Sequence, residues 1–229
     1  MTEPRGVEST RSAPAAVRRG RITGIRAQSR SPDRVSVFLD ERFAFGMHRD
    51  LLLKFELAVG MELSVDVQSD IARRDAFFKA RAVACRYLSY RERSTSEVRR
   101  RLQRDDYPSE VTDDVLHHLE EAGLVDDRRF ATAYAEMRFR SRGYGPIRVH
   151  AELRKKGIEP AAVEAVLEDV FAERDELLDR AREAGAKRWE VLTKASTVLE
   201  RKKKVYDHLA RRGYRFDMIR RVVDELEDL

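Results

Sequence analysis

The chain has 229 residues, of which 42% are hydrophobic and 38% are charged, and its formal net charge is +5. This length and apolar content are enough for one large or two modest folded domains, and the charged share lies well above the ordinary level of about 25%. A surface of this kind favours nucleic acid or an acidic protein over a small apolar substrate. The single cysteine excludes an intrachain disulfide and is typical of a reducing compartment.

The first 20 residues are rich in Pro, Ser, Arg and Gly and lack the apolar core of a signal peptide, so we predict a disordered basic tail over residues 1–20. No apolar run approaches the roughly 20 residues that span a membrane. We therefore expect a cytoplasmic protein that does not bind membranes.

Residues 21–69 predict a small β-rich module. RITGIRAQ alternates apolar and polar residues, and DRVSVFLDERFAFGM indicates two strands joined by a tight turn at Asp40-Glu41. HRDLLLKFEL indicates a short helix, and GMELSVDV indicates a further strand.

From about residue 70 the pattern is helical and contains a threefold repeat. Leu102, Leu153 and Leu209 each begin a run that aligns with the other two without gaps, namely LQRDDYPSEVTDDVLHHL, LRKKGIEPAAVEAVLEDV and LARRGYRFDMIRRVVDEL. Thirteen residues after each leucine comes a valine, at Val115, Val166 and Val222. We predict three three-helix repeats, each with a longer helix A, a basic helix B and a shorter helix C, over residues 70–123, 124–171 and 172–229.

Residues typical of helix ends divide each repeat into its helices. Ser94 with Glu97 has the spacing of a capping box, and Asp126 and Asp217 suit N-caps. In the third repeat, AREAGAKRWEVLTKAST reads as a long linker that leaves the first helix poorly bounded. The remaining signals are Pro146 and Pro160 at first-turn positions, Gly157 and Gly213 at left-handed helix ends, and Asp106 at the equivalent place in the first repeat.

Helix B of each repeat is basic, whereas acidic residues gather on helix C. For one helix, a solvated face with i,i+4 ion pairs is the simplest explanation. The same bias in all three repeats favours a surface that binds an acidic partner, either nucleic acid or a protein groove. Repeats stacked in series predict an elongated, curved rod with a long surface. The candidate binding residues are Arg99, Arg100, Arg101, Arg104, Arg148, Arg154, Lys155, Lys156, Lys202, Lys203, Arg211 and Arg212.

No catalytic, cofactor or metal site is expected. GYGP at 143–146 is too short for a dinucleotide loop and lacks the Lys-Ser/Thr of a P-loop. His117 and His118 are adjacent, so they point to different sides of a helix and do not suit one metal ion. Cys85 has no base partner nearby in sequence. Tyr144, flanked by glycines, is the best candidate for an exposed ring that stacks on a base.

Three runs give the chain a family resemblance: RERSTSEV at 91–98, GLVDDRRFA at 123–131 and AELRKKGI at 151–158. In combination they make the chain similar to the RecX family, regulators of the RecA recombinase. The likeness covers roughly residues 70–229, and residues 21–68 resemble the N-terminal extension that some members carry.

The resemblance implies a small, helical, non-enzymatic protein that modulates recombination and DNA repair. Such proteins bind in the groove of the RecA filament on single-stranded DNA, limit filament extension, and inhibit the ATPase, strand exchange and co-protease activities of RecA. The implied partners are therefore the RecA filament and DNA, and we expect a monomer without a cofactor. A stand-alone nucleic-acid-binding helical repeat protein stays open as the alternative.

Overall fold

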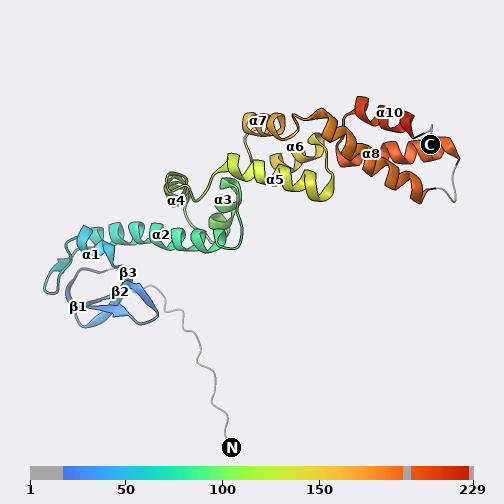
Figure 1. Cartoon of the computed structure of the whole chain (residues 1–229). Coiled ribbons are helices and arrows are strands. Elements are labelled where there is room, and N and C mark those ends of the chain that lie inside the picture. Colours follow the sequence, from blue (N-terminus) through green and yellow to red (C-terminus); the bar gives the residue numbers. More distant parts are fainter. Residues whose placement is uncertain (1–17, 193–196, 227–229) are drawn as a thin grey trace, which may run out of the picture. The chain divides into compact units, whose positions relative to one another are not determined.

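The computed structural model describes residues 18–192 and 197–226, and within them it is mainly helical with one N-terminal sheet (Figure 1). This confirms the expected fold class. The chain divides between Val83 and Ala84 into two compact units. Most of the expected basic tail, residues 1–17, lies outside the described residues.

The first unit contains a four-stranded antiparallel sheet with the order β3-β2-β1-β4. The turn between β2 and β3 consists of Asp40 and Glu41, which both have positive φ angles, 47° and 63°, as expected for a two-residue hairpin. The strands are β1 (Gly20–Gln28), β2 (Ser31–Leu39), β3 (Arg42–His48) and β4 (Glu62–Leu63). The sequence-based prediction of β1, β2, β3 and their turn is confirmed.

The prediction for GMELSVDV is wrong for most of that segment. Strand β4 has only two residues, and helix α2 (Val65–Leu88) begins directly after Ser64. The Ser64 hydroxyl accepts a 3.3 Å hydrogen bond from the Val67 amide, which satisfies a free donor at the helix start. The short helix expected before it is confirmed as α1 (Asp50–Lys54).

The sheet packs against the first half of α2 (Figure 1). Their shared core contains Ile22, Val37, Met47 and Ile71, all fully buried. The same side of α2 also carries a carboxylate, Asp75, into this interface. The module and the beginning of α2 therefore fold as one body.

Asp75 is the polar centre of that interface. It accepts hydrogen bonds from both terminal nitrogens of Arg34 at 3.0 and 2.9 Å and from the His48 amide at 2.8 Å, and Lys79 pairs with it at 2.9 Å. Burial acts to raise the pKa of Asp75, but Arg34 and Lys79 outweigh it and lower the pKa. The charged carboxylate thus joins strands β2 and β3 to α2.

The second unit completes the three predicted three-helix repeats. In the first repeat, α3 (Thr95–Arg104) and α4 (Ser109–Glu121) follow α2 and pack on each other. The second repeat consists of α5 (Asp127–Arg142), α6 (Pro146–Lys155) and α7 (Pro160–Val170). The third consists of α8 (Arg174–Val191), α9 (Val198–Arg212) and α10 (Phe216–Glu225). Helices α3, α6 and α9 are the basic helices B.

Equivalent apolar residues form the core of the second repeat and the core of the third repeat. The core of the second repeat contains Leu153, Ile158 and Val166, and that of the third contains Leu209 and Val222 at matching positions. Tyr214 takes the place of Ile158 and is 2% exposed. The repeat spacing in the sequence therefore reports the buried positions correctly.

Most predicted helix ends are confirmed. Ser94 and Glu97 form both hydrogen bonds of a capping box, and the Asp126 carboxylate accepts from the Arg129 amide at 2.9 Å. Pro146 and Pro160 stand at first-turn positions, Gly157 and Gly213 have φ angles of 82° and 85°, and Asp106 has a φ of 61°.

Two predictions in the third repeat are wrong. Asp217 is not an N-cap, because α10 starts one residue earlier, at Phe216, after an extended Arg215. The segment read as a long linker is helical as far as Val191, since α8 buries Ala181, Ala184 and Gly185 at helical spacing. Residues 193–196 of that segment lie outside the described residues.

Candidate functional site

Consecutive repeats meet through the ends of their basic helices. The start of α3 contacts the last turn of α6, where the Ser94 hydroxyl donates a 2.7 Å hydrogen bond to the Lys156 carbonyl. The start of α6 contacts the last turn of α9 in the same way, with the Gly145 amide 2.7 Å from the Arg212 carbonyl. The positive end of one helix dipole thus faces the negative end of the next.

The glycines that end α6 and α9 allow this close approach. A Cβ atom on Gly157 would lie 2.3 Å from the Ser96 Oγ, and one on Gly213 would lie 2.3 Å from the Arg148 backbone nitrogen. No real Cβ tolerates such a contact. The first repeat has Asp106 at the equivalent place, in the same left-handed conformation with a φ of 61°.

A cleft of about 360 Å³ opens beside the junction of the first two repeats; we call it the first cleft. It joins the exposed side of α3 to the last turn of α6, and it brings together five of the twelve candidate residues. The residues that line it are Tyr87, Glu97, Arg100, Arg101, Arg104, Lys155 and Lys156.

Two cations of the first cleft have structural partners. Lys156 Nζ lies 3.2 Å from Glu97 Oε1, and Arg101 pairs with Asp105 at 3.0 Å. Burial acts to raise the pKa of Glu97, but hydrogen bonds from Arg91 and Lys156 outweigh it and bring the pKa to about 2. Glu97 is therefore ionised and neutralises part of the cleft.

The remaining cations of the first cleft are available to a ligand. Arg104 and Lys155 are exposed, and neither forms an ion pair or a hydrogen bond through its side chain with any residue that the structure describes. Arg100 is also exposed and donates only to the backbone carbonyls of Ser96 and Lys156. These three side chains carry the positive charge of the first cleft.

Three other candidate residues stabilise the repeats themselves. Arg99 on α3 forms an ion pair with Asp113 on α4. Arg154 donates a 2.6 Å hydrogen bond to the Ile158 carbonyl at the turn after α6. Arg148 pairs with a carboxylate on its own helix and donates to the Arg211 carbonyl across the second junction.

Tyr144 is half-buried, so it is not the exposed ring that the flanking glycines predict. The Arg148 guanidinium covers its ring, with 3.7 Å between the guanidinium carbon and the ring centroid. A base cannot stack on that face without displacing the arginine.

The candidate residues of α9 are divided between surface and junction. Lys203 and Arg211 are exposed, and Lys202 is half-buried. Arg212 turns back toward the second repeat and donates a 2.7 Å hydrogen bond to the Arg142 carbonyl. It therefore helps to close the second junction.

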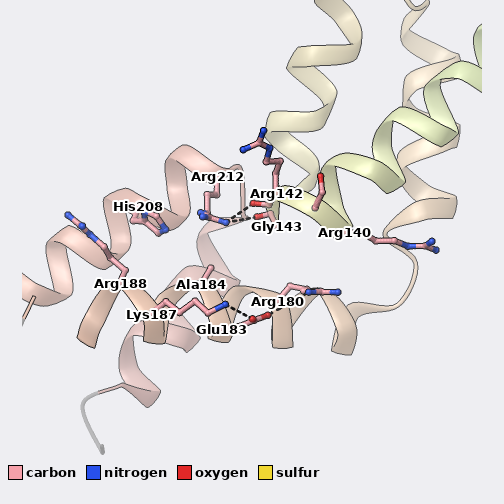
Figure 2. A pocket seen from close by; sticks show the side chains of 11 residues that line it. Arg140, Arg142, Gly143, Arg180, Glu183, Ala184, Lys187, Arg188, His208 and Arg212 are labelled. Carbon is pink, nitrogen blue, oxygen red and sulfur yellow. Dashed lines mark hydrogen bonds and ion pairs between the residues drawn. The ribbon is translucent and has the colours of Figure 1, made fainter. Parts of the chain in front are cut away.

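A second cleft, of about 410 Å³, lies beside that junction (Figure 2). The ends of α5 and α9 and the middle of α8 form its walls. Among the twelve candidate residues only Arg212 lines it, and its other cations were not predicted from the sequence. They are Arg140, Arg142, Arg180, Lys187 and Arg188, and they are accompanied by Ser141, Gly143, Glu183, Ala184 and His208.

Two of the missed cations, Lys187 and Arg188, lie in the segment 181–197 that was predicted to be a linker, and Arg180 directly precedes it. Helical spacing of Leu177, Leu178, Ala181 and Ala184 was the available signal. Helix α8 places Arg180, Lys187 and Arg188 within about two turns of one another.

Within the residues that the structure describes, no group of three or more His, Cys, Asp and Glu side chains is arranged to hold a metal ion. No helix in the same residues is long and apolar enough to cross a membrane.

Four domain models of one family match the chain in order. They are the RecX N-terminal domain at residues 20–64 and the first, second and third RecX three-helix domains at 80–119, 126–167 and 175–223. Their order is that of the sheet and the three repeats.

Solved structures agree with this order. A crystal structure of regulatory protein RecX superposes with a TM-score of 0.77 at 26% identity and covers 90% of this chain and 99% of its own. The crystal structure of RecX from Lactobacillus salivarius has the same fold, with a TM-score of 0.60 at 22% identity over 68% of this chain and 99% of its own.

Sequence relatives lead to the same family. Regulatory protein RecX of Bacillus licheniformis is 35% identical over 209 residues, which are 90% of this chain and 77% of the relative. The protein of the same name from Bacillus subtilis is 34% identical over the same shares. From the four domain matches and these relatives, we conclude that the chain belongs to the RecX family of regulatory proteins.

Proposed function

We propose that the chain is a non-enzymatic modulator of RecA that binds the RecA filament on single-stranded DNA. It limits extension of the filament and inhibits its ATPase, strand exchange and co-protease activities. It acts in the cytoplasm, as a monomer, in recombination and DNA repair. No step of this function requires chemistry by the chain itself, because binding that holds neighbouring filament subunits hinders their ATP turnover.

The observation that carries the proposal is the first cleft. Helices B of two consecutive repeats contribute to it, and its exposed cations Arg100, Arg104 and Lys155 lie at a junction that the fold repeats along the chain. Several moderately attractive sites on one chain raise the avidity for a polymeric partner without any single strong contact. A filament of RecA on DNA is such a polymer, since its acidic groups recur along its length.

The test is the ATPase rate of RecA on single-stranded DNA as the chain is titrated in. We expect inhibition by the wild-type chain at amounts below one chain per RecA. A variant with Arg104→Glu and Lys155→Glu is expected to need at least about tenfold more protein for the same inhibition, because it loses two exposed cations of the first cleft. The variant should still fold, because neither side chain has a partner among the described residues. An ATPase that stays unchanged at saturating wild-type chain contradicts the proposal.

The matched control is Arg215→Glu with Arg220→Glu. Both arginines are exposed on or next to α10 and line neither cleft, and their reversal changes the net charge by the same amount. We expect this control to inhibit like the wild type. Equal loss in both variants would mean that net charge, and not the first cleft, determines the inhibition.

Comparison of bare DNA with RecA-coated DNA tests the alternative function. A RecA modulator binds the filament more tightly than the bare strand at physiological salt. A chain that binds both equally, with the same salt dependence, is a stand-alone nucleic-acid-binding protein.

A further inference from the structure

The second cleft concentrates positive charge. Six arginine and lysine side chains line it, against a single carboxylate, Glu183. Figure 2 shows Glu183 between Lys187 and Arg180, which are 2.7 and 3.6 Å from it. One carboxylate therefore neutralises one of these charges at most.

The other arginines of the second cleft are not matched by carboxylates on its walls. Arg212 is engaged with the backbone carbonyls of Arg142 and Gly143, which leaves its charge intact (Figure 2). The Arg142 side chain is exposed and forms no hydrogen bond or ion pair with any described residue. Arg140 pairs only with Glu136, a half-buried glutamate on its own helix, at 3.8 Å among the described residues.

His208 lies among the cations of the second cleft. Burial is the first cause that lowers the pKa of His208, and the neighbouring charges of Arg212, Arg188 and Arg211 lower it further. The contribution of the three arginines is in the direction expected for a site with excess positive charge. The second cleft thus favours an anion.

The lining of the second cleft also indicates which kind of anion. It contains no Phe, Tyr or Trp on which a nucleobase would stack, and His208 is its only ring. Guanidinium groups match the paired oxygens of a phosphate, and several of them at one site suit more than one phosphate. The chemistry therefore recognises a run of phosphates and ignores the bases.

We infer that the second cleft binds the phosphate backbone of a single DNA strand, with Arg142, Lys187, Arg188 and Arg212 as the contacting side chains. The inference rests on the proposed function, because it assigns the DNA contact of the chain to the junction of the second and third repeats. The first cleft is then left for the remaining acidic surface of the filament.

The experiment measures binding of the full chain to a fluorescent oligo-dT and to an abasic strand of the same length. We expect equal affinity for the two. For Arg142→Glu with Lys187→Glu we expect at least about a tenfold loss of DNA affinity. We also expect the slope of log affinity against log salt to become shallower by about 1.4, because each phosphate contact on a single strand contributes about 0.7 to that slope. The α10 control, Arg215→Glu with Arg220→Glu, is expected to keep most of the affinity and to show a smaller change of slope.

Three outcomes would overturn the inference. They are wild-type affinity in the cleft variant, equal loss in the α10 control, or clearly weaker binding of the abasic strand. Tripolyphosphate distinguishes a free anion from a strand. If the wild type binds it tightly and the cleft variant does not, while DNA binding is the same in both, the cleft is a site for free polyphosphate.

The outcome is separable from that of the proposed function. If the cleft variant loses DNA affinity but the wild type never inhibits the RecA ATPase, the inference stands and the proposed function fails. If the wild type inhibits the ATPase but DNA binding does not depend on the cleft, the reverse holds.

Discussion

The Ser94 hydroxyl joins the start of α3 to the end of α6. It accepts a hydrogen bond from the Glu97 amide at 3.2 Å and donates one to the Lys156 carbonyl at 2.7 Å, and the residue is fully buried. One side chain therefore caps a helix within its own repeat and satisfies a free carbonyl in the next.

Replacement of Ser94 by alanine removes both hydrogen bonds. We expect a loss of about 2 kcal/mol in the free energy of unfolding, about half from the cap and half from the bond between repeats. Thr197→Ala is the control, because Thr197 forms the same capping box on α9 but is exposed, and it should lose about 1 kcal/mol. Urea unfolding followed by circular dichroism measures both; equal losses would show that the Lys156 bond contributes nothing.

Gly213→Ala should destabilise the second junction through a steric clash. The left-handed conformation alone costs about 1 to 2 kcal/mol for a residue with a Cβ. Gly123→Ala isolates that cost, since Gly123 has a φ of 66° but open space around it. We expect Gly213→Ala to lose at least twice as much as Gly123→Ala, measured by urea unfolding with the fluorescence of the single tryptophan, Trp189. A similar loss in the two variants would contradict the close approach to Arg148.

The low pKa of Glu97 makes the first junction sensitive to acid. Because its pKa is about 2 in the folded chain and near 4.5 otherwise, the ionised form stabilises the fold above pH 4.5, and this contribution is lost as the pH falls toward 2. Its full size is up to about 3 kcal/mol. The free energy of unfolding of the wild type should therefore fall more steeply between pH 5 and 2 than that of Glu97→Gln. If the free energies of unfolding of the two proteins fall in parallel with pH, ionised Glu97 does not stabilise the fold.

Asp75→Ala should separate the sheet from α2. The substitution leaves Arg34, which is only 21% exposed, without its carboxylate, and breaking a buried pair in this way costs about 3 to 5 kcal/mol. Asp70→Ala on the same helix breaks only an exposed pair with Arg73 and should cost less than about 1 kcal/mol. Hydrogen exchange of the β2 and β3 amides is the measurement; unchanged protection in Asp75→Ala would refute the assignment.

Local signals in the sequence were sufficient for most helix ends. Ser94, Asp126, Pro146 and Gly213 act on donors and carbonyls a few residues away, so their effect can be read without a fold. The prediction of Asp217 as an N-cap was wrong because the repeat register decides where α10 begins. Tyr214 is buried at the position of Ile158, and the helix starts two residues after that position in both repeats.

The clefts could not be predicted in the same way. Ser94 and Lys156 are 62 residues apart, and nothing in either stretch specifies the other. Charge counts along helix B identified Arg104 and Lys155 but also included Arg99 and Arg154, whose partners become visible only in three dimensions. A count of positive charges along one helix cannot distinguish an arginine that forms an ion pair from one that does not.

The order in which the two helices of each junction are synthesised also matters. Each contact is made by the start of one helix B with the end of a helix B that the ribosome produces later, 62 residues later for Ser94 and Lys156. At elongation rates of about 5 to 20 residues per second, the buried face of the first repeat therefore waits about 3 to 12 s for its neighbour. During that interval the Ser94 hydroxyl has no Lys156 carbonyl to bind, so the contact between the first two repeats forms only after the second helix B has been synthesised.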